Sequence, residues 1–325
     1  MKAHTIPSTL YICEICNNAE NNKTYTIEEK MYRTGDSFIY FKCAKCGCLQ
    51  ISEIPSDVAK FYDSSSYYSL QPKNKSRNLV IIRDWLKKQL FSYYLENKNI
   101  IGFVLKKIYN DPYYWFPKKK LNFNSRILDV GCGSGGLLRQ MAEGGFKNLY
   151  GIDPFLKNNL QYKTAKGVIV NIDKKHLSEI DQKYDFIMLH HVFEHMSNPH
   201  DVIENLKKIM SEDAKLLIRI PTVDGYFWRK YKLNWFQIDA PRHFFLHSLE
   251  SIRYILQTHG LKIENLLYDG IWSTFYLSEK YQRGLSMLSD DYSCTKEEKK
   301  TYQKKIKHLN LQGDSDQLCL LISKI

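Results

Sequence analysis

Acidic, glycine and cysteine residues gather in the stretch RILDVGCGSGGLL at residues 126–138. A strand-like apolar run carries Asp129 and breaks directly into glycines at every second position, after which an apolar helical pattern begins. A strand that turns through glycine into a helix is how α/β sheets hold ligands at the carboxyl ends of their strands. Glycine permits the tight turn and leaves room where a Cβ would stand. The residues predicted to contact a ligand here are Asp129, Gly131, Cys132, Gly133 and Gly135.

The spacing is compatible with two nucleoside-containing ligands. Counting Gly136 as the third glycine gives the dinucleotide pattern G-x-G-x-x-G, whereas the acid before the first glycine gives D-x-G-x-G-x-G. A second strand-like segment ends on Asp153, 24 residues after Asp129, where a carboxylate can accept hydrogen bonds from both hydroxyls of a ribose. That acid suits either ligand. The acid at 129 decides the choice, because D-x-G-x-G-x-G resembles motif I of the class I S-adenosylmethionine (SAM) methyltransferases.

The resemblance continues through roughly residues 125–270. The apolar strand at 167–170 is followed by Asp173, which by this resemblance contacts the adenine of SAM. The segment 184–199, YDFIMLHHVFEHMSNP, looks like motif IV of the subgroup that contains small-molecule O-methyltransferases and sugar methyltransferases. His190, near the end of this strand, is placed to pack against the cofactor. The resemblance implies an α/β fold with a Rossmann-like, seven-stranded, mostly parallel sheet, and SAM as cofactor.

Methyl transfer to an alcohol or an acidic carbon requires a base that removes the proton of the acceptor. His195 is the candidate catalytic residue, because it follows the fourth strand on the face where the methyl group is expected, and histidine titrates near neutral pH. Glu194 beside it could orient His195 or bind an acceptor hydroxyl. The alternative is that His195 only caps the next helix or bonds to a backbone carbonyl.

Two further polar residues, Arg242 and His243, resemble a family segment that carries a histidine over the active site. A guanidinium there could clamp a diphosphate or carboxylate, and a structural ion pair is an equal alternative. They lie in an aromatic insertion, 222–247, whose rings could stack on a sugar or base or could form a self-packed lid. The predicted substrate-binding residues are Glu194, Arg242 and His243.

Residues 1–60 contain two C-x-x-C pairs separated by 26 residues. Each pair can offer two thiolates, and two pairs complete a tetrahedron around Zn²⁺. The gap is longer than the usual spacing of about 15–20 residues, which a β-hairpin would absorb. Cys48 could in principle replace Cys46. A closed site of four cysteines has no position for substrate, so the predicted zinc is structural. Its ligands are Cys13, Cys16, Cys43 and Cys46.

The predicted linker spans residues 61–120. Some carbohydrate methyltransferases are similar in carrying an N-terminal zinc-binding segment and then a tyrosine-rich stretch, here at 61–69. Apolar residues recur at helical spacing over 78–110 with lysines opposite, a pattern that can lie on a membrane surface but more often covers a sheet or an active site. The N-terminal segment is expected to be a small zinc-ribbon-like β unit, and residues 121–325 a SAM-binding catalytic domain.

Beyond the fourth strand, the hydrophobic pattern predicts three strands and three helices. The strands are expected at 215–221, 261–267 and 317–325, and the helices at 201–210, 248–260 and 278–308. The formal charge of +12 suits anionic partners, although solvated lysine-rich faces explain it equally. No apolar run is long enough to span a bilayer, and residues 1–5 are polar, unlike a signal peptide. We therefore expect a cytoplasmic protein with reduced cysteines.

Taken together, the motifs favour methylation of an oxygen, with carbon second, in a carbohydrate or related small molecule that could be nucleotide- or lipid-linked. An RNA methyltransferase is an alternative suggested by zinc and positive charge. The chain lacks the Asn/Asp-Pro-Pro-Tyr/Phe signature that many base amino-group methyltransferases place at the fourth strand, so nucleic acid is not the favoured partner. A non-catalytic binding protein with the same fold is a third alternative, and the intact glycine loop with Asp153 argues against it. Peripheral membrane contact is left open, and neither the acceptor nor the oligomeric state follows from the sequence.

Overall fold

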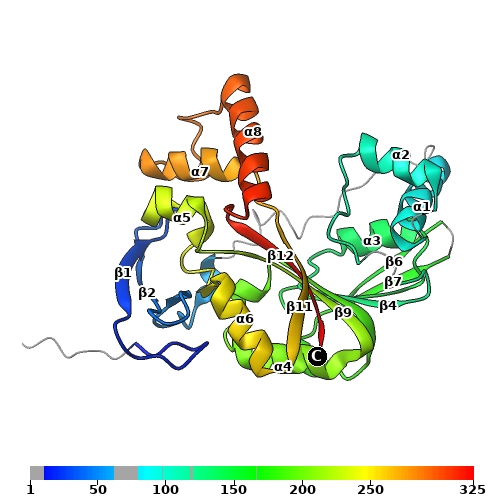
Figure 1. The fold of residues 1–325 in the computed structure, drawn as a ribbon, viewed down its shortest axis with the longest axis horizontal. Helices are drawn as coiled ribbons and strands as arrows, with labels where there is room; N and C mark the ends of the chain where they lie inside the picture. The colour runs from blue at the N-terminus through cyan, green and yellow to red at the C-terminus, as the bar shows by residue number, and fades with distance from the viewer. Residues whose placement is uncertain (1–10, 62–79, 97, 118–119, 166) are drawn as a thin grey trace, which may run out of the picture.

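The chain folds around two β-sheets, one of eight strands and one of four (Figure 1). The structure is a computed structural model that describes residues 11–61, 80–96, 98–117, 120–165 and 167–325. The predicted tyrosine-rich stretch lies outside these residues, except for Phe61 at its start.

The larger sheet has the strand order β11-β12-β9-β8-β4-β5-β7-β6. Its five central strands are parallel, whereas β12 is antiparallel to both of its neighbours and β6 is antiparallel to β7. The bounds are β4 Arg126–Val130, β5 Asn148–Ile152, β6 Leu160–Lys163, β7 Ile169–Asp173, β8 Tyr184–His190, β9 Met210–Pro221, β11 Leu261–Tyr268 and β12 Gln317–Lys324. Central strands buried on both faces read as continuous apolar runs, as β8 does in its FIML segment.

The predicted fold class is confirmed, and each of the seven predicted strands is present. The eighth strand, β6, was not predicted, because its sequence LQYK is short and only alternates between half-buried and exposed positions. It lies between β5 and β7 along the chain and forms an antiparallel hairpin with β7 at the sheet edge.

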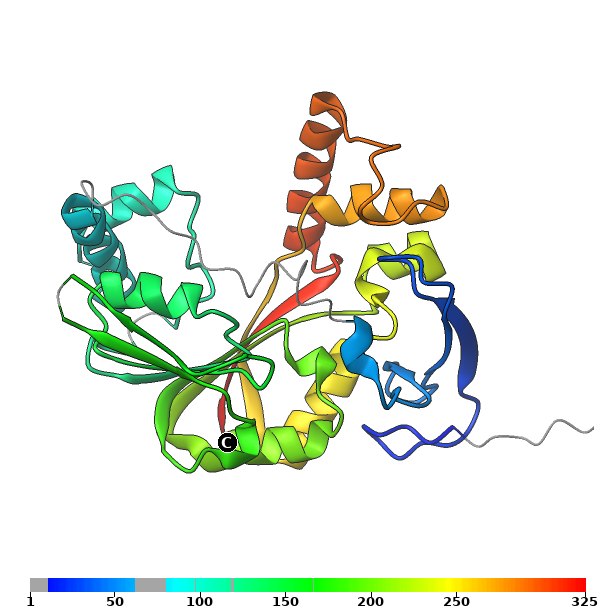
Figure 2. The ribbon, with the colours of Figure 1, turned by 180° about the vertical axis from the view of Figure 1, so that it is seen from behind.

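Helices cover both faces of this sheet. Two of them, α1 and α2, form a hairpin that packs with α3 on one face, while α4 and α6 lie on the other (Figure 1). The predicted C-terminal helix is two helices, α7 and α8, which project from the rest of the chain (Figure 2). The bounds are α1 Val80–Glu96, α2 Ile100–Ile108, α3 Gly136–Glu143, α4 Pro199–Ile209, α5 Tyr226–Tyr231, α6 Leu249–Thr258, α7 Ser273–Gln282 and α8 Lys296–Gln312.

The smaller sheet combines the N-terminal segment with the insertion that follows β9. It contains β1 Lys23–Glu28, β2 Ser37–Lys42, β3 Leu49–Ile51 and β10 Phe245–Leu246, all antiparallel. The last strand, β10, belongs to the aromatic insertion, and its pairing with β3 brings residues almost 200 positions apart into one ladder. Figure 2 shows this sheet beside α5 and α6. The insertion is thus partly ordered into α5 and β10, and its rings Phe227 and Trp235 are fully buried.

Among the described residues, no helix is both long and apolar enough to cross a bilayer.

Candidate functional site

The glycine loop joins β4 to α3 in left-handed backbone conformations. The φ angles are 68° at Gly131, 53° at Gly133 and 71° at Gly135. The protein's own side chains fill the space beside two of these glycines: a Cβ on Gly135 would lie 1.9 Å from Cδ1 of Ile172, and one on Gly131 would lie 2.5 Å from Cγ2 of Val192. Glycine is therefore required here by backbone conformation and by internal packing, and not only by the approach of a ligand.

Two carboxyl groups meet beside this loop. Asp153 follows β5, where its Oδ2 accepts a hydrogen bond from the Gly133 N–H at 2.9 Å and its Oδ1 accepts one from Phe155 N–H at 2.9 Å. Each carboxylate oxygen has a second lone pair, so the group can still accept hydroxyl donors. Asp129, in the neighbouring strand β4, is buried, and this burial together with the charge of Asp153 raises the pKa of Asp129 to about 8.

The other two predicted cofactor residues near the loop lie differently. Asp173 ends β7, next to β5 in the sheet, and its half-buried carboxylate lies 3.6 Å from Nζ of Lys175. Cys132 turns its thiol inward, since a Cβ on Gly151 would lie 2.6 Å from its Sγ. The carboxyl ends of β4, β5 and β7 thus gather Asp129, Asp153 and Asp173, whereas the Cys132 thiol packs against Gly151.

Glu194, His195 and His243 form a second group at the end of β8. Each residue places one oxygen or nitrogen within 4.8 Å of the corresponding atoms of the other two. Glu194 is fully buried, and among the described residues no donor hydrogen-bonds to either of its carboxylate oxygens. Nδ1 of His191 lies 3.6 Å from its Oε1. Burial favours the neutral acid, but the three surrounding histidines outweigh burial and lower the pKa of Glu194 to about 2.

The two histidines of this group are oriented by backbone carbonyls. Nδ1 of His195 lies 2.8 Å from the carbonyl oxygen of Arg242, and Nδ1 of His243 lies 2.7 Å from that of Gln237. A carbonyl can only accept, so both Nδ1 atoms donate, and in a neutral ring the lone pair then lies on Nε2. Burial lowers the pKa of His243 to about 4, with His195 contributing, which keeps His243 neutral near pH 7.

Arg242 lies inside the protein with 1 % of its side chain exposed. Its guanidinium donates to Glu29 Oε1 at 2.8 Å and to Asp239 Oδ1 at 2.6 Å. This geometry favours the structural ion pair over the predicted substrate clamp, because the guanidinium is not exposed to solvent. Its role in the site is indirect, through the carbonyl that orients His195.

A further polar group, which the sequence did not reveal, lies at the ends of β8, β9 and β11. Arg219 donates through Nε to Asp269 Oδ2 at 2.7 Å and through Nη2 to the Tyr114 hydroxyl at 2.9 Å. The Tyr114 hydroxyl in turn donates to Asp269 Oδ2 at 2.5 Å, and Nη1 of Arg219 lies 3.3 Å from Nδ1 of His190. We call these four residues the Arg219 cluster. Tyr114 and Asp269 stand 155 positions apart in the chain, and no local motif links them.

His190 and the next residue, His191, connect the two polar groups. His190 belongs to the Arg219 cluster and packs against Trp115, whereas His191 faces Glu194. The turn between them requires the left-handed conformation, with φ at 55° for His191. The end of β8 therefore lies between the Arg219 cluster and the Glu194–His195–His243 group. The strand β8 also pairs with β4, from which the glycine loop starts.

This arrangement is matched by a known family. Residues 106–266 match the family described as "Methyltransferase domain". The chain contains a methyltransferase domain. The match spans β4 to β11, and with it the glycine loop, the glutamate–histidine pair at the end of β8 and most of Arg219's neighbours.

Curated relatives of two kinds are similar to the methyltransferase domain. A ubiquinone biosynthesis O-methyltransferase of Glaesserella parasuis is 30 % identical over 107 residues, which are 30 % of this chain and 45 % of the relative. One of Rickettsia bellii is 27 % identical over 168 residues, 47 % of this chain and 70 % of the relative. A tRNA U34 carboxymethyltransferase of Campylobacter hominis is 27 % identical over 106 residues, 31 % and 37 % of the two chains. The matched segment thus spans less than half of the first and third of these relatives.

Solved structures are similar at lower identity. A magnesium protoporphyrin IX methyltransferase from Synechocystis PCC 6803 has a TM-score of 0.41 at 14 % identity, covering 83 % of this chain and 99 % of that one. A SAM-dependent methyltransferase from Archaeoglobus fulgidus has a TM-score of 0.40 at 19 % identity, covering 73 % and 98 %.

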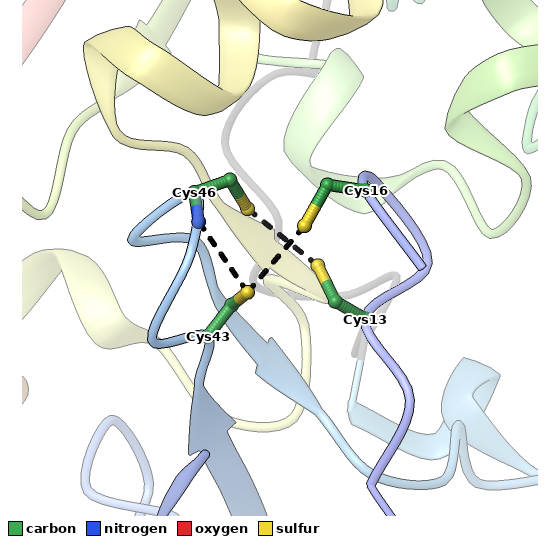
Figure 3. A group of neighbouring side chains, drawn as sticks. All are labelled: Cys13, Cys16, Cys43 and Cys46. Carbon is green, nitrogen blue, oxygen red and sulfur yellow. Dashed lines mark hydrogen bonds between the residues drawn. The ribbon is translucent and has the colours of Figure 1, made fainter. Parts of the chain in front are cut away.

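Four cysteines converge outside the methyltransferase domain (Figure 3). The Sγ atoms of Cys13 and Cys46 are 3.6 Å apart, and those of Cys16 and Cys43 are 3.5 Å apart. Sulfur ligands at about 2.3 Å from a tetrahedral Zn²⁺ lie about 3.8 Å from one another, so the spacing fits zinc. Cys48 is buried but lies outside this group, with its thiol near the carbonyl of Leu49.

Proposed function

We propose that this protein transfers the methyl group of SAM to an oxygen atom, with carbon second, of a hydroxylated small molecule. The proposal rests on two groups of residues that lie together at the carboxyl ends of the central strands. Asp153 and the glycine loop lie at the ends of β4 and β5, and the Glu194–His195–His243 group lies at the end of the adjacent β8. Ligands of open α/β sheets bind outside the carboxyl ends of such strands.

The bound cofactor would supply an electrophilic methyl group on a sulfonium, and the protein must position the acceptor and remove its proton. Asp153, whose carboxylate is already fixed by the loop, would accept the ribose hydroxyls. Asp173 would lie toward the adenine and His190 toward the reacting end. His195 would take the acceptor proton on Nε2, since its Nδ1–H is given to the carbonyl of Arg242. Its imidazolium would then be stabilised by the ionised Glu194.

A carbohydrate or a related hydroxylated ring is the acceptor class that we favour. The glutamate–histidine motif and the N-terminal cysteine segment support it, and ubiquinone biosynthesis O-methyltransferases among the relatives also support an oxygen acceptor. The relatives that act on tRNA U34 support the RNA alternative. Incubation of the purified protein with methyl-labelled SAM and, separately, total RNA and a small-molecule extract tests both. Label in RNA alone would replace our proposal, and failure to bind SAM would overturn it.

Zinc bound by Cys13, Cys16, Cys43 and Cys46 would have a structural role. The knuckles join the N-terminal sheet to the methyltransferase domain, because Ser248 donates a hydrogen bond to the Cys46 carbonyl and the Ile15 carbonyl lies 3.0 Å from Nε2 of His200. We therefore propose that residues 1–60 stabilise the site, while 61–120 link them to the catalytic residues 121–325.

An anionic membrane surface is the partner that we propose for α2. Only Gly102 and Leu105 of this helix are buried, and its exposed side chains are mostly apolar. Residues 80–120 contain nine Lys or Arg and three Asp or Glu, so the segment that carries this apolar surface has a net positive charge. The exposed apolar residues of α2 and the turn after it are Ile100, Ile101, Phe103, Val104, Ile108 and Tyr109. Co-sedimentation with phosphatidylglycerol vesicles that is lost in Ile100→Glu, but not in Leu311→Glu on α8, would support it.

A further inference from the structure

The Arg219 cluster contains two buried polar atoms without a hydrogen-bond partner among the described residues. One is Oδ1 of Asp269, and the other is Nε2 of His190. Buried polar atoms are nearly always paired in native proteins, so each one calls for a physical reason. Here both belong to a single hydrogen-bonded group at the carboxyl ends of β8, β9 and β11, and ligands of this architecture bind outside the carboxyl ends of the strands.

The proton positions in this cluster follow from its contacts. The guanidinium of Arg219 can only donate, so Nδ1 of His190 accepts and the ring carries its hydrogen on Nε2. Burial, with Arg219 and His191 as smaller causes, lowers the pKa of His190 to about 3, so the ring is neutral. His190 Nε2 is therefore an unpaired donor, and Asp269 Oδ1 is an unpaired acceptor.

The charge of the cluster indicates what it can bind. Arg219 is already neutralised by Asp269, at 2.7 Å, and also donates to Tyr114, so the guanidinium is not available to clamp a phosphate or a carboxylate. Only 6 % of the Asp269 side chain is exposed, which makes an additional unpaired charge there costly. A hydroxyl group can pair with either unpaired atom, because it can donate a hydrogen bond to Asp269 Oδ1 or accept one from His190 Nε2–H.

We propose that the Arg219 cluster is the acceptor-binding centre, and that it recognises a neutral vicinal diol of a sugar or aromatic ring. One hydroxyl donates to Asp269 Oδ1, and its neighbour accepts from His190 Nε2–H. This inference rests on the proposed function, because it places the acceptor beside the end of β8. The Trp115 ring, 4.8 Å from the His190 ring, gives the diol-bearing ring an apolar wall.

The test uses the full-length protein loaded with S-adenosylhomocysteine, and two probes: catechol and methyl α-glucoside. Their dissociation constants are measured by ligand-observed NMR at millimolar concentration. We expect at least one probe to bind the wild-type protein, and Asp269→Asn to weaken it about tenfold or more, because hydrogen bonds to charged groups are the stronger ones. Affinity for SAM, measured by calorimetry on Asp269→Asn, should change less than twofold.

Two further variants serve as a second test of the cluster and as a control. His190→Phe retains a ring against Trp115 but removes the donor, and it should weaken the probes even if Asp269→Asn fails to fold. Asp314→Asn breaks an Arg–Asp pair of similar length on the surface, that of Arg229 at 2.6 Å, and should leave probe binding unchanged. A wild-type protein that binds neither probe, or variants with unchanged probe affinity, would overturn the proposal. A parallel loss of SAM affinity would assign the cluster to the cofactor instead, and absence of SAM binding in the wild type would reject the proposed function itself.

Discussion

The carbonyl oxygen of Arg242 lies 2.8 Å from Nδ1 of His195, and this contact fixes which nitrogen of the candidate base is basic. The same arginine is held by Glu29, from the N-terminal segment, and by Asp239, from the insertion. Tyr40 of β2 adds a second connection, since its hydroxyl donates to the His243 carbonyl at 2.9 Å. The cysteine-containing segment is therefore part of the support of the candidate active site, and two predictions concern this support.

Removing the charge of Glu29 should destabilise the protein and slow methyl transfer. Glu29→Gln leaves a buried guanidinium with one carboxylate fewer, and breaking a buried pair costs about 3–5 kcal/mol. Urea denaturation measures the loss in the free energy of unfolding. We expect a value near the lower end of this range, because Asp239 still pairs with Arg242 in the variant. Glu204→Gln, which breaks an exposed pair with Lys208, serves as control and should leave the midpoint unchanged. Equal stability of the two variants would show that Arg242 needs no partner from the N-terminal segment.

Loss of one predicted zinc ligand should release the metal and loosen the N-terminal sheet. Cys43→Ser removes a thiolate from the group in Figure 3, and structural zinc sites contribute directly to folding energy. Metal analysis of the wild-type protein should find about one zinc per chain, and the variant should have less and melt at a lower temperature. Cys294→Ser, which lies outside the group, should retain the wild-type content. A metal-free protein with an unchanged melting temperature would contradict the zinc assignment.

The pH dependence of the free energy of unfolding should reflect the ionisation of Asp129. Its pKa rises on folding, from the ordinary aspartate value to about 8, because it is buried beside Asp153. The folded state is thus favoured while Asp129 holds its proton, fully so below about pH 4, and loses this stability as the pH rises towards 8. Asp129→Asn cannot ionise and should be more stable than the wild type at pH 8 by at least about 1 kcal/mol. Thermal denaturation between pH 5 and 9 checks this, with exposed Asp181→Asn as control. Identical slopes for the wild type and Asp129→Asn would show that the carboxyl is already ionised at pH 5.

Seven of the eight strands of the larger sheet were predictable because each buried strand and its neighbouring helix have a local hydrophobic period, which the short, half-exposed β6 lacks. The glycine loop was predictable from its D-x-G-x-G-x-G spacing, although two of its glycines also face the side chains of Ile172 and Val192. Contacts between distant residues were not predictable. The pairing of β10 with β3, the Arg242–Glu29 pair and the Tyr114–Asp269 contact each join residues more than 150 positions apart. One sequence contains no signal for such partners, because side-chain type alone does not determine which distant group it meets.

Asp153→Ala should weaken SAM binding by about 1.5–3 kcal/mol, the usual range for a hydrogen bond to a charged group. Part of this loss would come through the loop, because Asp153 also holds the Gly133 N–H at 2.9 Å. Asp153→Asn separates the two contributions, since its amide oxygen can still accept from the loop but its amide nitrogen cannot accept from a ribose. Calorimetry with SAM and S-adenosylhomocysteine provides the measurement. Wild-type affinity in Asp153→Ala would remove Asp153 from the cofactor site.

His195→Ala should slow methyl transfer by about 10²–10⁴-fold while leaving SAM affinity close to that of the wild type, because a positioned general base contributes on this order. The expectation rests on geometry: Nε2 is the basic nitrogen, and the ionised Glu194 lies within the same group. Single-turnover rates with saturating SAM separate the chemical step from binding. His191→Ala is the matched control, since it removes the other histidine near Glu194 but leaves His195 and its carbonyl partner in place. If His195→Ala keeps more than about a third of the wild-type rate, no general base of the expected strength acts there. His195 would then be structural, and His243, which belongs to the same group, would be the next residue to substitute.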